Sequence, residues 1–412
     1  MEALGQAEAG DARAARDRSG GALVFVGFMG AGKTSAARTV AGELGVEHHD
    51  LDRELERDLG ESIESFFDRE GEPAFRAREE EVAVRMLANP AVRVASLGGG
   101  SLGSARVREA LANHVVVLLE VDARDAWQRA SGKGRPLARD RARFEQLLAD
   151  RLPLYESVAD AVLPAADRGL PRRALPGLDA LRQAPPRTRM VWAAASSGEY
   201  PVFAGHGLVA SGFFHPRDGR RFVVTDENLA RHHRVPSESE IVIPAGETEK
   251  TLARVEEVLR ALATAGAERG DIVVGVGGGV VGDLSGFAAA IYQRGVRHVQ
   301  VPTTLVSQVD SAYGGKTGVD LPEGKNYAGA FHQPSAVIVD RDALRTLPRE
   351  ELAAGYAEVV KTALIAGGQL WARVRGGAAP DDDEIVLGCI RTKLAVVAED
   401  ERDAGRRQVL NL

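Results

Sequence analysis

Two lysines stand close together in the segment "YGGKTGVDLPEGKNYAG" (residues 313–329), namely Lys316 and Lys325. The whole chain has only seven lysines among its 52 basic residues. An ammonium is a compact charge whose pKa changes on burial, whereas a guanidinium is a planar fork that stays charged. In a chain this rich in arginine, each lysine is therefore a candidate point charge in a binding or catalytic site. The alternative interpretation is that these are surface lysines in a loop.

A second lysine-bearing segment, "GFMGAGKTS", fits the pattern G-x-x-x-x-G-K-[ST] from Gly27 to Gly32, Lys33 and Thr34. It follows an apolar strand expected over 22–27 and opens a helix, which is the context that this phosphate loop requires. Backbone N–H groups would cradle phosphates, Lys33 would neutralise the β and γ oxygens, and Thr34 would hold Mg²⁺. The alternative is a glycine turn that caps a helix. The pattern predicts ATP and magnesium binding by Gly30, Gly32, Lys33, Thr34 and Ser35.

Charged residues and glycines in the same half could form a pocket for a phosphate acceptor. Asp50 and Asp52 lie two apart in "HHDLDREL", and in an extended segment both carboxylates would point to one side. One could meet Mg²⁺ while the other accepts a hydroxyl proton; the alternative is a solvated acidic pair. Three glycines at 98–100 would let a small ligand reach the backbone. The basic stretch "ASGKGRPLARDR" suits a lid that closes over the transferring phosphate.

Over residues 22–165 the chain resembles the shikimate kinases, in its P-loop, "DLD", "GESIESFFDREGEPAFR", "GGG", "RPL" and "RLPLYESVAD". The resemblance implies a P-loop kinase domain, with a parallel sheet flanked by helices, that phosphorylates shikimate with ATP. It implies that Asp52 binds the acceptor hydroxyl and acts as the base, and that Asp50 supports Mg²⁺. "RPLA" departs from the second leucine usual in the family. The other implied site residues are Arg76 and Arg151 as a carboxylate clamp, Gly98, Gly99 and Gly100 in the pocket wall, and Arg135 as the lid arginine.

The second half contains another glycine-rich strand end, "DIVVGVGGGVVGDLSGF", with G-x-G-x-x-G at Gly277, Gly279 and Gly282. A lone match is weak, and no acidic ribose partner follows at a strand end about twenty residues on. We therefore expect dinucleotide binding in another arrangement. The residues that other strand ends offer to ribose and adenine are Asp226, Asn228, Glu247 and Lys250.

The series "PAGETEK", "GVGGGVVGDLSGFAAAIYQRG", "VPTTLVSQVDSAYGGKTGVDLPEGKN", "TLPREELAAGYAEVVK" and "RRQVLNL" resembles 3-dehydroquinate synthase over 190–412. The resemblance implies that 3-deoxy-D-arabino-heptulosonate 7-phosphate is oxidised with NAD⁺, loses phosphate, is re-reduced and closes a ring. The implied NAD site comprises Gly278, Gly279, Asp283, Thr303, Thr304, Asp310, Lys325, Thr346, Leu347 and Glu351. The implied substrate contacts are Lys316, Asn326, Lys361, Lys393, Arg407 and Asn411, with Lys316 and Lys361 catalytic and Arg294 reaching phosphate across a homodimer interface. Glu358 is the implied ligand of a zinc or cobalt ion.

Composition, net charge and cysteine count exclude several classes of protein. With 412 residues, 44% hydrophobic and 27% charged, the sequence is typical of a soluble globular chain. The net charge of −7 argues against nucleic acid as the main partner, and no apolar stretch approaches the length of a membrane span. The single cysteine, Cys389, excludes a disulfide framework and a thiolate zinc site. We expect a cytoplasmic enzyme with small-molecule substrates.

Apolar runs alternate with helix-length segments in both halves, which predicts two parallel α/β layers. From about residue 346 the spacing becomes helical. The expected domains are a disordered tail over 1–19, a P-loop kinase domain over 20–169, a linker over 170–189, an NAD-binding α/β domain over 190–345, and the start of a helical metal and substrate domain over 346–412.

The main hypothesis is a bifunctional enzyme of the shikimate pathway that combines both activities. The sequence leaves two alternatives open: a kinase fused to another sugar-phosphate cyclase, or to a non-catalytic NAD-binding or dimerising module. The family pattern continues past Leu412 with metal-binding histidines, so we expect an incomplete metal site and no synthase activity in this chain. Lys316, Lys361 and Lys393 would then face water. Because all seven lysines fall in motifs of the two resemblances, the surface-lysine interpretation is rejected.

Overall fold

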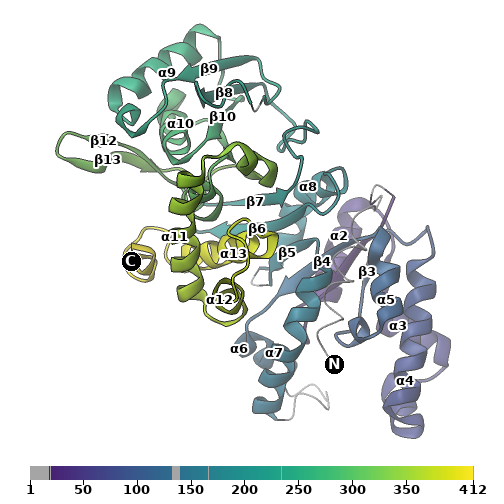
Figure 1. The fold of residues 1–412 in the computed structure, drawn as a ribbon. Helices are drawn as coiled ribbons and strands as arrows, with labels where there is room; N and C mark the ends of the chain where they lie inside the picture. Colours follow the sequence, from purple (N-terminus) through teal and green to yellow (C-terminus); the bar gives the residue numbers. More distant parts are fainter. Residues whose placement is uncertain (1–17, 19, 132–139, 166, 233, 412) are drawn as a thin grey trace. The chain divides into compact units, whose positions relative to one another are not determined.

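The computed structural model describes residues 18, 20–131, 140–165, 167–232 and 234–411 (Figure 1). The chain divides into two compact units, Met1–Trp192 (unit 1) and Ala193–Leu412 (unit 2). Apart from Arg18, the expected tail over 1–19 lies outside the described residues, as does the expected lid arginine Arg135. Arg18 is buried and pairs with Asp160 at 2.9 Å, so the tail prediction is wrong for this residue.

Unit 1 is built on parallel strands in the order β2-β3-β1-β4-β5-β6. All four residues of β1 are buried, as expected for a strand covered on both faces of a parallel sheet. The strands are β1 (Leu23–Val26), β2 (His48–Asp50), β3 (Val94–Ser96), β4 (Val115–Glu120), β5 (Ala161–Pro164) and β6 (Arg189–Ala195). The helices are α2 (Lys33–Leu44), α3 (Leu51–Leu59), α4 (Ile63–Leu87), α5 (Ala105–Ala110), α6 (Ala123–Ala130), α7 (Arg141–Val158) and α8 (Leu170–Arg182), with short 3₁₀ turns η1 (Ser101–Gly103) and η2 (Leu111–Asn113).

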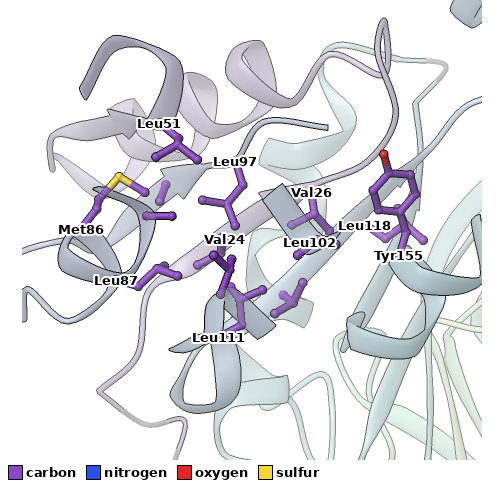
Figure 2. Close-up of a cluster of buried hydrophobic side chains, with 14 of the residues drawn as sticks. Val24, Val26, Leu51, Met86, Leu87, Leu97, Leu102, Leu111, Leu118 and Tyr155 are labelled. Atoms are coloured by element: carbon purple, nitrogen blue, oxygen red, sulfur yellow. The ribbon is translucent and has the colours of Figure 1, made fainter. Parts of the chain in front are cut away.

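The core of unit 1 forms between this sheet and its helices. Val24 and Val26 of β1 pack with Leu51 at the start of α3 and Met86 near the end of α4 (Figure 2). Tyr155 of α7 joins the same cluster. The core therefore lies directly beneath the loops that follow β1, β2 and β3.

Residues 170–182, expected in a linker, form helix α8 instead. Pro171 lies at the start of the helix, where proline is tolerated because the first N–H groups have no intrahelical partner. Leu170, Ala174, Leu178 and Leu181 recur at helical spacing and are buried. The Pro- and Arg-rich composition concealed this apolar face, so the linker prediction is wrong for this segment.

Unit 2 has a second parallel series, in the order β7-β14-β11-β10-β8-β9. Its strands are β7 (Gly198–Gly205), β8 (Arg221–Asp226), β9 (Ser239–Ile243), β10 (Ile272–Gly277), β11 (Arg297–Pro302) and β14 (Ala336–Asp340). Its helices and helical turns are η4 (Glu247–Glu249), α9 (Leu252–Thr264), α10 (Gly279–Ile291), η5 (Tyr292–Arg294), the π-helical η6 (Ser307–Ser311) and η7 (Arg341–Thr346). An antiparallel hairpin, β12 (Lys316–Leu321) and β13 (Gly324–Phe331), stands out from the rest of unit 2 (Figure 1).

After η7 the described chain is helical, as the spacing predicted. The elements are α11 (Arg349–Ala366), α12 (Gly368–Arg375), α13 (Asp383–Glu399) and η8 (Arg406–Asn411). Within the described ranges, none of the helices combines the length and apolar character needed to cross a bilayer.

His206 links helix α13 to the turn η7 in unit 2. His206 follows β7; its Nδ1 lies 2.9 Å from Asp342 of η7 and its Nε2 lies 3.0 Å from Asp383 of α13. Ionised carboxylates only accept hydrogen bonds, so both ring nitrogens must donate and the imidazole is protonated. Hydrogen bonding to Asp383, against the effect of burial and with further help from Asp342, raises the pKa of His206 to about 9.

We expect this contact to make the stability of unit 2 fall at high pH. The pKa of His206 is raised from 6.5 to about 9, so its contribution is fully present below about pH 6.5 and is lost as pH rises through 9. Because 45% of the side chain is exposed, screening limits the contribution to roughly 1 kcal/mol. His206→Gln should therefore lower the unfolding free energy at pH 6.5 and have little effect at pH 10. Equal losses at both pH values, measured by urea unfolding, would contradict this.

Candidate active sites

The phosphate loop joins β1 to α2 in unit 1. Gly30 and Gly32 adopt left-handed φ angles of 82° and 89°, which glycine adopts without strain. A side chain at Gly30 would also lie 2.7 Å from the carbonyl oxygen of Ala126. The loop ends at Lys33, the first residue of α2, so the helix N-terminus opens onto it. The predicted strand–loop–helix context is confirmed.

Asp50 and Thr34 form the candidate magnesium site. Thr34 Oγ1 donates to Asp50 Oδ2 at 2.8 Å, and Ser96 Oγ donates to the same oxygen at 2.7 Å. Burial alone would raise the pKa of Asp50, but hydrogen bonds from Ser96 and Thr34 outweigh it and hold this pKa below its ordinary value. The result is an ionised carboxylate and a hydroxyl side by side, which are hard oxygen ligands of the kind Mg²⁺ prefers.

Asp52 lies on a different element from the one expected. The strand β2 ends at Asp50, whose side chain caps α3, and Asp52 is in the first turn of that helix. The expectation of two carboxylates along one extended segment is therefore wrong, because the capping carboxylate starts a helix at once. Asp50 is buried and Asp52 is exposed. Asp52 nevertheless faces the glycine loop: its Oδ1 lies 3.3 Å from where a Cβ of Gly98 would be.

Arg76 is presented by the second segment of α4. The helix is broken at Gly71, which has φ 81°, and Pro73 lies at the start of the new segment. Arg76 Nη1 donates to Glu79 at 2.6 Å, and the buried Glu79 carboxylate also accepts from Ser101 Oγ at 2.9 Å. Arg76 Nε and Nη2 also donate to the exposed Glu72 carboxylate at 3.3 Å, so one edge of the guanidinium meets a buried acid and the other an exposed one.

The glycine loop after β3 brings both arginines together. A Cβ at Gly100 would lie 2.5 Å from Arg76 Nη1, so only glycine lets the guanidinium approach this closely. On the other side, Arg151 Nη1 donates to the carbonyl oxygen of Gly99 at 3.1 Å. Since β2, β3 and β1 are neighbours, their carboxyl ends place the aspartates, the glycine loop and the phosphate loop at one edge of the sheet.

Three residues of this site were not identified from the sequence: Ser96, Glu79 and Tyr155. Ser96 is the last residue of β3 and precedes the predicted glycines by two positions. Glu79 is three residues after Arg76 on one helix, a spacing that pairs opposite charges. The sequence spacing alone could therefore have pointed to Ser96 and Glu79. It could not point to Tyr155, whose hydroxyl donates to the carbonyl oxygen of Gly99 from a distant helix.

In unit 2 the candidate cofactor residues also follow neighbouring strands. Gly278 and Gly279 follow β10, and Thr303 and Thr304 follow β11. A Cβ at Gly278 would lie 2.9 Å from Thr304 Cγ2, and α10 begins at Gly279. The loop thus brings backbone N–H groups and a helix N-terminus to a narrow cradle, a recognised arrangement for anions.

Lys250, Asp283 and Asn326 form a polar cluster in unit 2, in which Lys250 is buried, Asp283 is half-buried and Asn326 is exposed. Lys250 Nζ lies 2.6 Å from Asp283 Oδ2 and donates to Asn326 Oδ1 at 2.6 Å. Asn326 adopts a left-handed φ of 58°, and its N–H donates to Asp320 at 2.7 Å. Burial raises the pKa of Asp283 although Lys250 opposes this shift. The structure thus brings together three of the predicted site residues from segments far apart in the sequence.

A second cluster gathers residues expected at the substrate. Lys393 Nζ lies 2.6 Å from Asp310, and Lys361 pairs with Glu358 and donates to the carbonyl oxygen of Leu410 at 2.8 Å. Lys393 is buried, and burial lowers its pKa although Asp310 opposes this shift. Lys361 is only 15% exposed. The expectation that these two lysines face water is therefore wrong. Lys393 is paired with Asp310 of η6, and Lys361 is held by Glu358 of its own helix and by the Leu410 carbonyl of η8.

Arg407 completes this cluster. It is buried in η8 and donates to the carbonyl oxygens of Gly314 at 3.0 Å and Glu401 at 2.6 Å. Burial lowers its pKa, against the influence of Asp403 and Asp310.

The two lysines of the hairpin lie on its surface. Lys316 is 46% exposed and pairs with Asp403, and Lys325 is 73% exposed and lies 3.2 Å from Glu247. The surface interpretation thus describes their exposure correctly, while each ammonium also faces an acid from another segment. The rejection of the surface-lysine interpretation is therefore wrong for Lys316 and Lys325.

The other predicted residues of unit 2 lie around these clusters. Asp226 ends β8 and accepts from the N–H of Asn228 at 3.0 Å, and burial raises its pKa. Arg294 is exposed with a left-handed φ of 68°. The remaining positions are Thr346 and Leu347 at the end of η7, Glu351 exposed in α11, and Asn411 at the end of η8.

Glu358 is the predicted ligand of a zinc or cobalt ion. Among the described residues, no group of three or more histidine, cysteine, aspartate or glutamate side chains is placed to hold a metal ion. The Glu358 carboxylate is instead paired with Lys361.

Fold and geometry define the class of each unit: unit 1 is a P-loop nucleotide-binding α/β domain, and unit 2 is a parallel α/β domain with a glycine cradle followed by helices. Comparison with protein families agrees and is more specific. Residues 29–172 match shikimate kinase, residues 240–354 match the N-terminal domain of 3-dehydroquinate synthase, and residues 355–412 match its C-terminal domain. The chain therefore carries shikimate kinase and 3-dehydroquinate synthase domains together.

Known relatives match the second half. The 3-dehydroquinate synthase of Rhodospirillum rubrum is 46% identical over 52% of this chain and 61% of its own length. That of Symbiobacterium thermophilum is 43% identical over 52% of this chain and 65% of its own. The chain thus spans less than two thirds of the length of these relatives.

A solved shikimate kinase from Acinetobacter baumannii, in complex with shikimate, is 36% identical over 38% of this chain and 90% of that one, with a TM-score of 0.36.

Proposed function

We propose that unit 1 transfers the γ-phosphate of ATP to a hydroxyl of shikimate. The observation that carries this proposal is the convergence, at the carboxyl ends of β2, β3 and β1, of a phosphate loop, Asp52 and two arginines around Gly98–Gly100. A small acceptor with one carboxylate and a ring of hydroxyls matches this set. Arginine forks bind carboxylates in a bidentate manner, and an exposed aspartate can take a hydroxyl proton.

Each residue then has a definite task. Lys33 and the N-terminus of α2 stabilise the phosphate oxygens, and Asp52 accepts the proton of the attacking hydroxyl. Thr34 and Asp50 would hold Mg²⁺, which neutralises charge on the phosphates when bound. Arg76 and Arg151 hold the acceptor's carboxylate so that its hydroxyl faces Asp52.

We expect Arg76→Ala to raise the KM for shikimate by about 10- to 100-fold, the equivalent of a charge-assisted hydrogen bond of roughly 1.5–3 kcal/mol. The KM for ATP should stay within about twofold of the wild-type value, because Arg76 lies by the glycine loop and not in the phosphate loop. Steady-state kinetics with each substrate varied in turn measures both. Arg106→Ala serves as the control, since Arg106 is an exposed arginine whose partner is Glu80. A selective rise in the KM for ATP would contradict the assignment of Arg76.

For unit 2 we propose NAD⁺ binding and a role in the conversion of heptulosonate 7-phosphate to 3-dehydroquinate. The cradle at Gly278 and Gly279 would hold the pyrophosphate, and Lys250, Asp283 and Glu247 lie on the segments that follow β9 and begin α10. NAD⁺ would supply a hydride acceptor when bound. The basic cluster of Lys361, Lys393 and Arg407 suits an anionic phosphate or carboxylate of the substrate. We further propose a cytoplasmic location and, as the resemblance to 3-dehydroquinate synthase implies, a homodimer through unit 2.

NAD⁺ titrated into the full chain should release or absorb heat with a 1:1 stoichiometry. Gly278→Val should abolish this signal, because even the first atom of a side chain there would lie 2.9 Å from Thr304. Gly270→Val, at an open position, is the matched control. Absence of any binding heat at millimolar NAD⁺, from protein whose unit 2 is folded, would refute the proposal.

A further inference from the structure

Tyr155 is a buried tyrosine whose hydroxyl reaches the glycine loop. Its side chain is 1% exposed, and its ring belongs to the core of unit 1. Figure 2 shows the hydroxyl oxygen pointing away from the other labelled side chains. This hydroxyl donates to the carbonyl oxygen of Gly99 at 2.6 Å. A core side chain thus places its one polar atom on the wall of the candidate acceptor pocket.

The same carbonyl oxygen is held by Arg151. Arg151 lies four residues before Tyr155 on α7, so both side chains leave the same face of the helix. Arg151 Nη1 donates to Gly99 O at 3.1 Å. Burial raises the pKa of Tyr155, and the nearby positive charge of Arg151 opposes this rise. Tyr155, Arg151 and the Gly99 carbonyl therefore fix one another.

When the orientation of the Gly99 carbonyl is fixed, the orientation of the Gly100 N–H group is fixed with it. The peptide unit between Gly99 and Gly100 is planar and trans, so its N–H points away from its carbonyl and hence away from Tyr155. Glycines have the greatest backbone freedom of all residues, so this peptide needs outside contacts to hold one orientation. Gly100 in turn abuts the guanidinium of Arg76. One hydroxyl thus influences both arginines and the peptide between them.

We propose that Tyr155 is a positioning residue for acceptor binding: through Gly99 it sets the orientation of Arg151 and of the Gly99–Gly100 peptide toward the substrate's carboxylate. The proposal rests on the kinase function proposed for unit 1. The hydrogen bond of the Tyr155 hydroxyl goes to Gly99, in the loop that also meets Arg76 and Arg151, so we expect its main effect on acceptor binding. Phenylalanine keeps the ring that fills the core and removes only the oxygen.

The test compares Tyr155→Phe with the wild-type full chain in steady-state kinetics. The KM for shikimate should rise about 3- to 10-fold, the equivalent of one lost hydrogen bond, while kcat and the KM for ATP stay within about twofold. Tyr292→Phe is the matched control, because it removes a hydroxyl that donates to a backbone carbonyl, that of Ala267 at 2.9 Å, in unit 2. This control should leave all three constants unchanged.

A cycle with Arg151→Gln gives a second readout. If Tyr155 acts through Arg151 and their shared carbonyl, its removal should cost much less in the Arg151→Gln background than in the wild type. An unchanged shikimate KM in Tyr155→Phe, strictly additive effects in the cycle, or loss of the ATP site together with folding would each overturn the positioning role. A wild-type chain without shikimate-dependent activity would instead refute the proposed function itself.

Discussion

Replacing Asp52 with asparagine is expected to lower kcat for shikimate phosphorylation by roughly two to four orders of magnitude, the usual contribution of a general base. Asparagine has nearly the same shape, so the first turn of α3 and the nearby Gly98 should keep their places. The amide cannot take the hydroxyl proton in the transition state. The KM for ATP should change little, because the phosphate loop follows a different strand.

Asp58→Asn provides the control for this experiment. Asp58 lies six residues further along the same helix and pairs with Arg78 and Arg85 away from the glycine loop. Asp58 is only 16% exposed, but asparagine keeps its shape and one acceptor oxygen for the arginines, so we expect the control to fold and turn over normally. Turnover by Asp52→Asn at the wild-type rate would show that Asp52 is not the base.

Replacing Lys250 with methionine is expected to destabilise unit 2 by about 2–4 kcal/mol, because it leaves the largely buried Asp283 carboxylate without its cation. The estimate lies slightly below the range for fully buried pairs, since 21% of the Asp283 side chain remains exposed. Asn326 Oδ1 also loses its hydrogen bond from Lys250 Nζ. Urea unfolding of the full chain, followed by a signal from unit 2, measures the change.

The double variant Lys250→Met/Asp283→Leu distinguishes the cause. Once neither charge is present, much of the lost stability should return, because an apolar pair of similar size avoids the cost of burying an unpaired charge. NAD⁺ binding should remain weakened in both variants if the pair also belongs to the cofactor site. A single variant as stable as the wild type, or a double variant less stable than the single one, would show that this ion pair does not support unit 2.

Local patterns predicted the kinase half of the fold well. The phosphate loop is defined by glycines, Lys33 and Thr34 within eight positions, and each role depends on backbone geometry that the neighbouring strand and helix impose. The approach of Arg76 to Gly100 was implied only by the family resemblance, because the two residues lie on separate elements. The error at Asp52 was local: it was expected in an extended segment, but Asp50 caps α3 and Asp52 lies in the first turn of that helix.

The partners of the lysines could not be predicted from spacing. Lys393 meets Asp310 across 83 residues, and Lys250 meets Asn326 across 76. Such pairs depend on how helices and hairpins pack on the sheet, and the periodicity of apolar residues carries no information about that packing. Helix α8 was missed for a related reason, since its buried face is made of leucine and alanine at positions interrupted by proline and arginine.

The most direct test of the kinase assignment is ADP release by the full chain with MgATP, measured with and without millimolar shikimate, together with the mass of the product. We expect shikimate to raise ADP release to rates of order 1 s⁻¹ or above, and to gain one phosphoryl group for each ADP formed. ADP release that does not respond to shikimate, or that leaves shikimate unmodified, would contradict it.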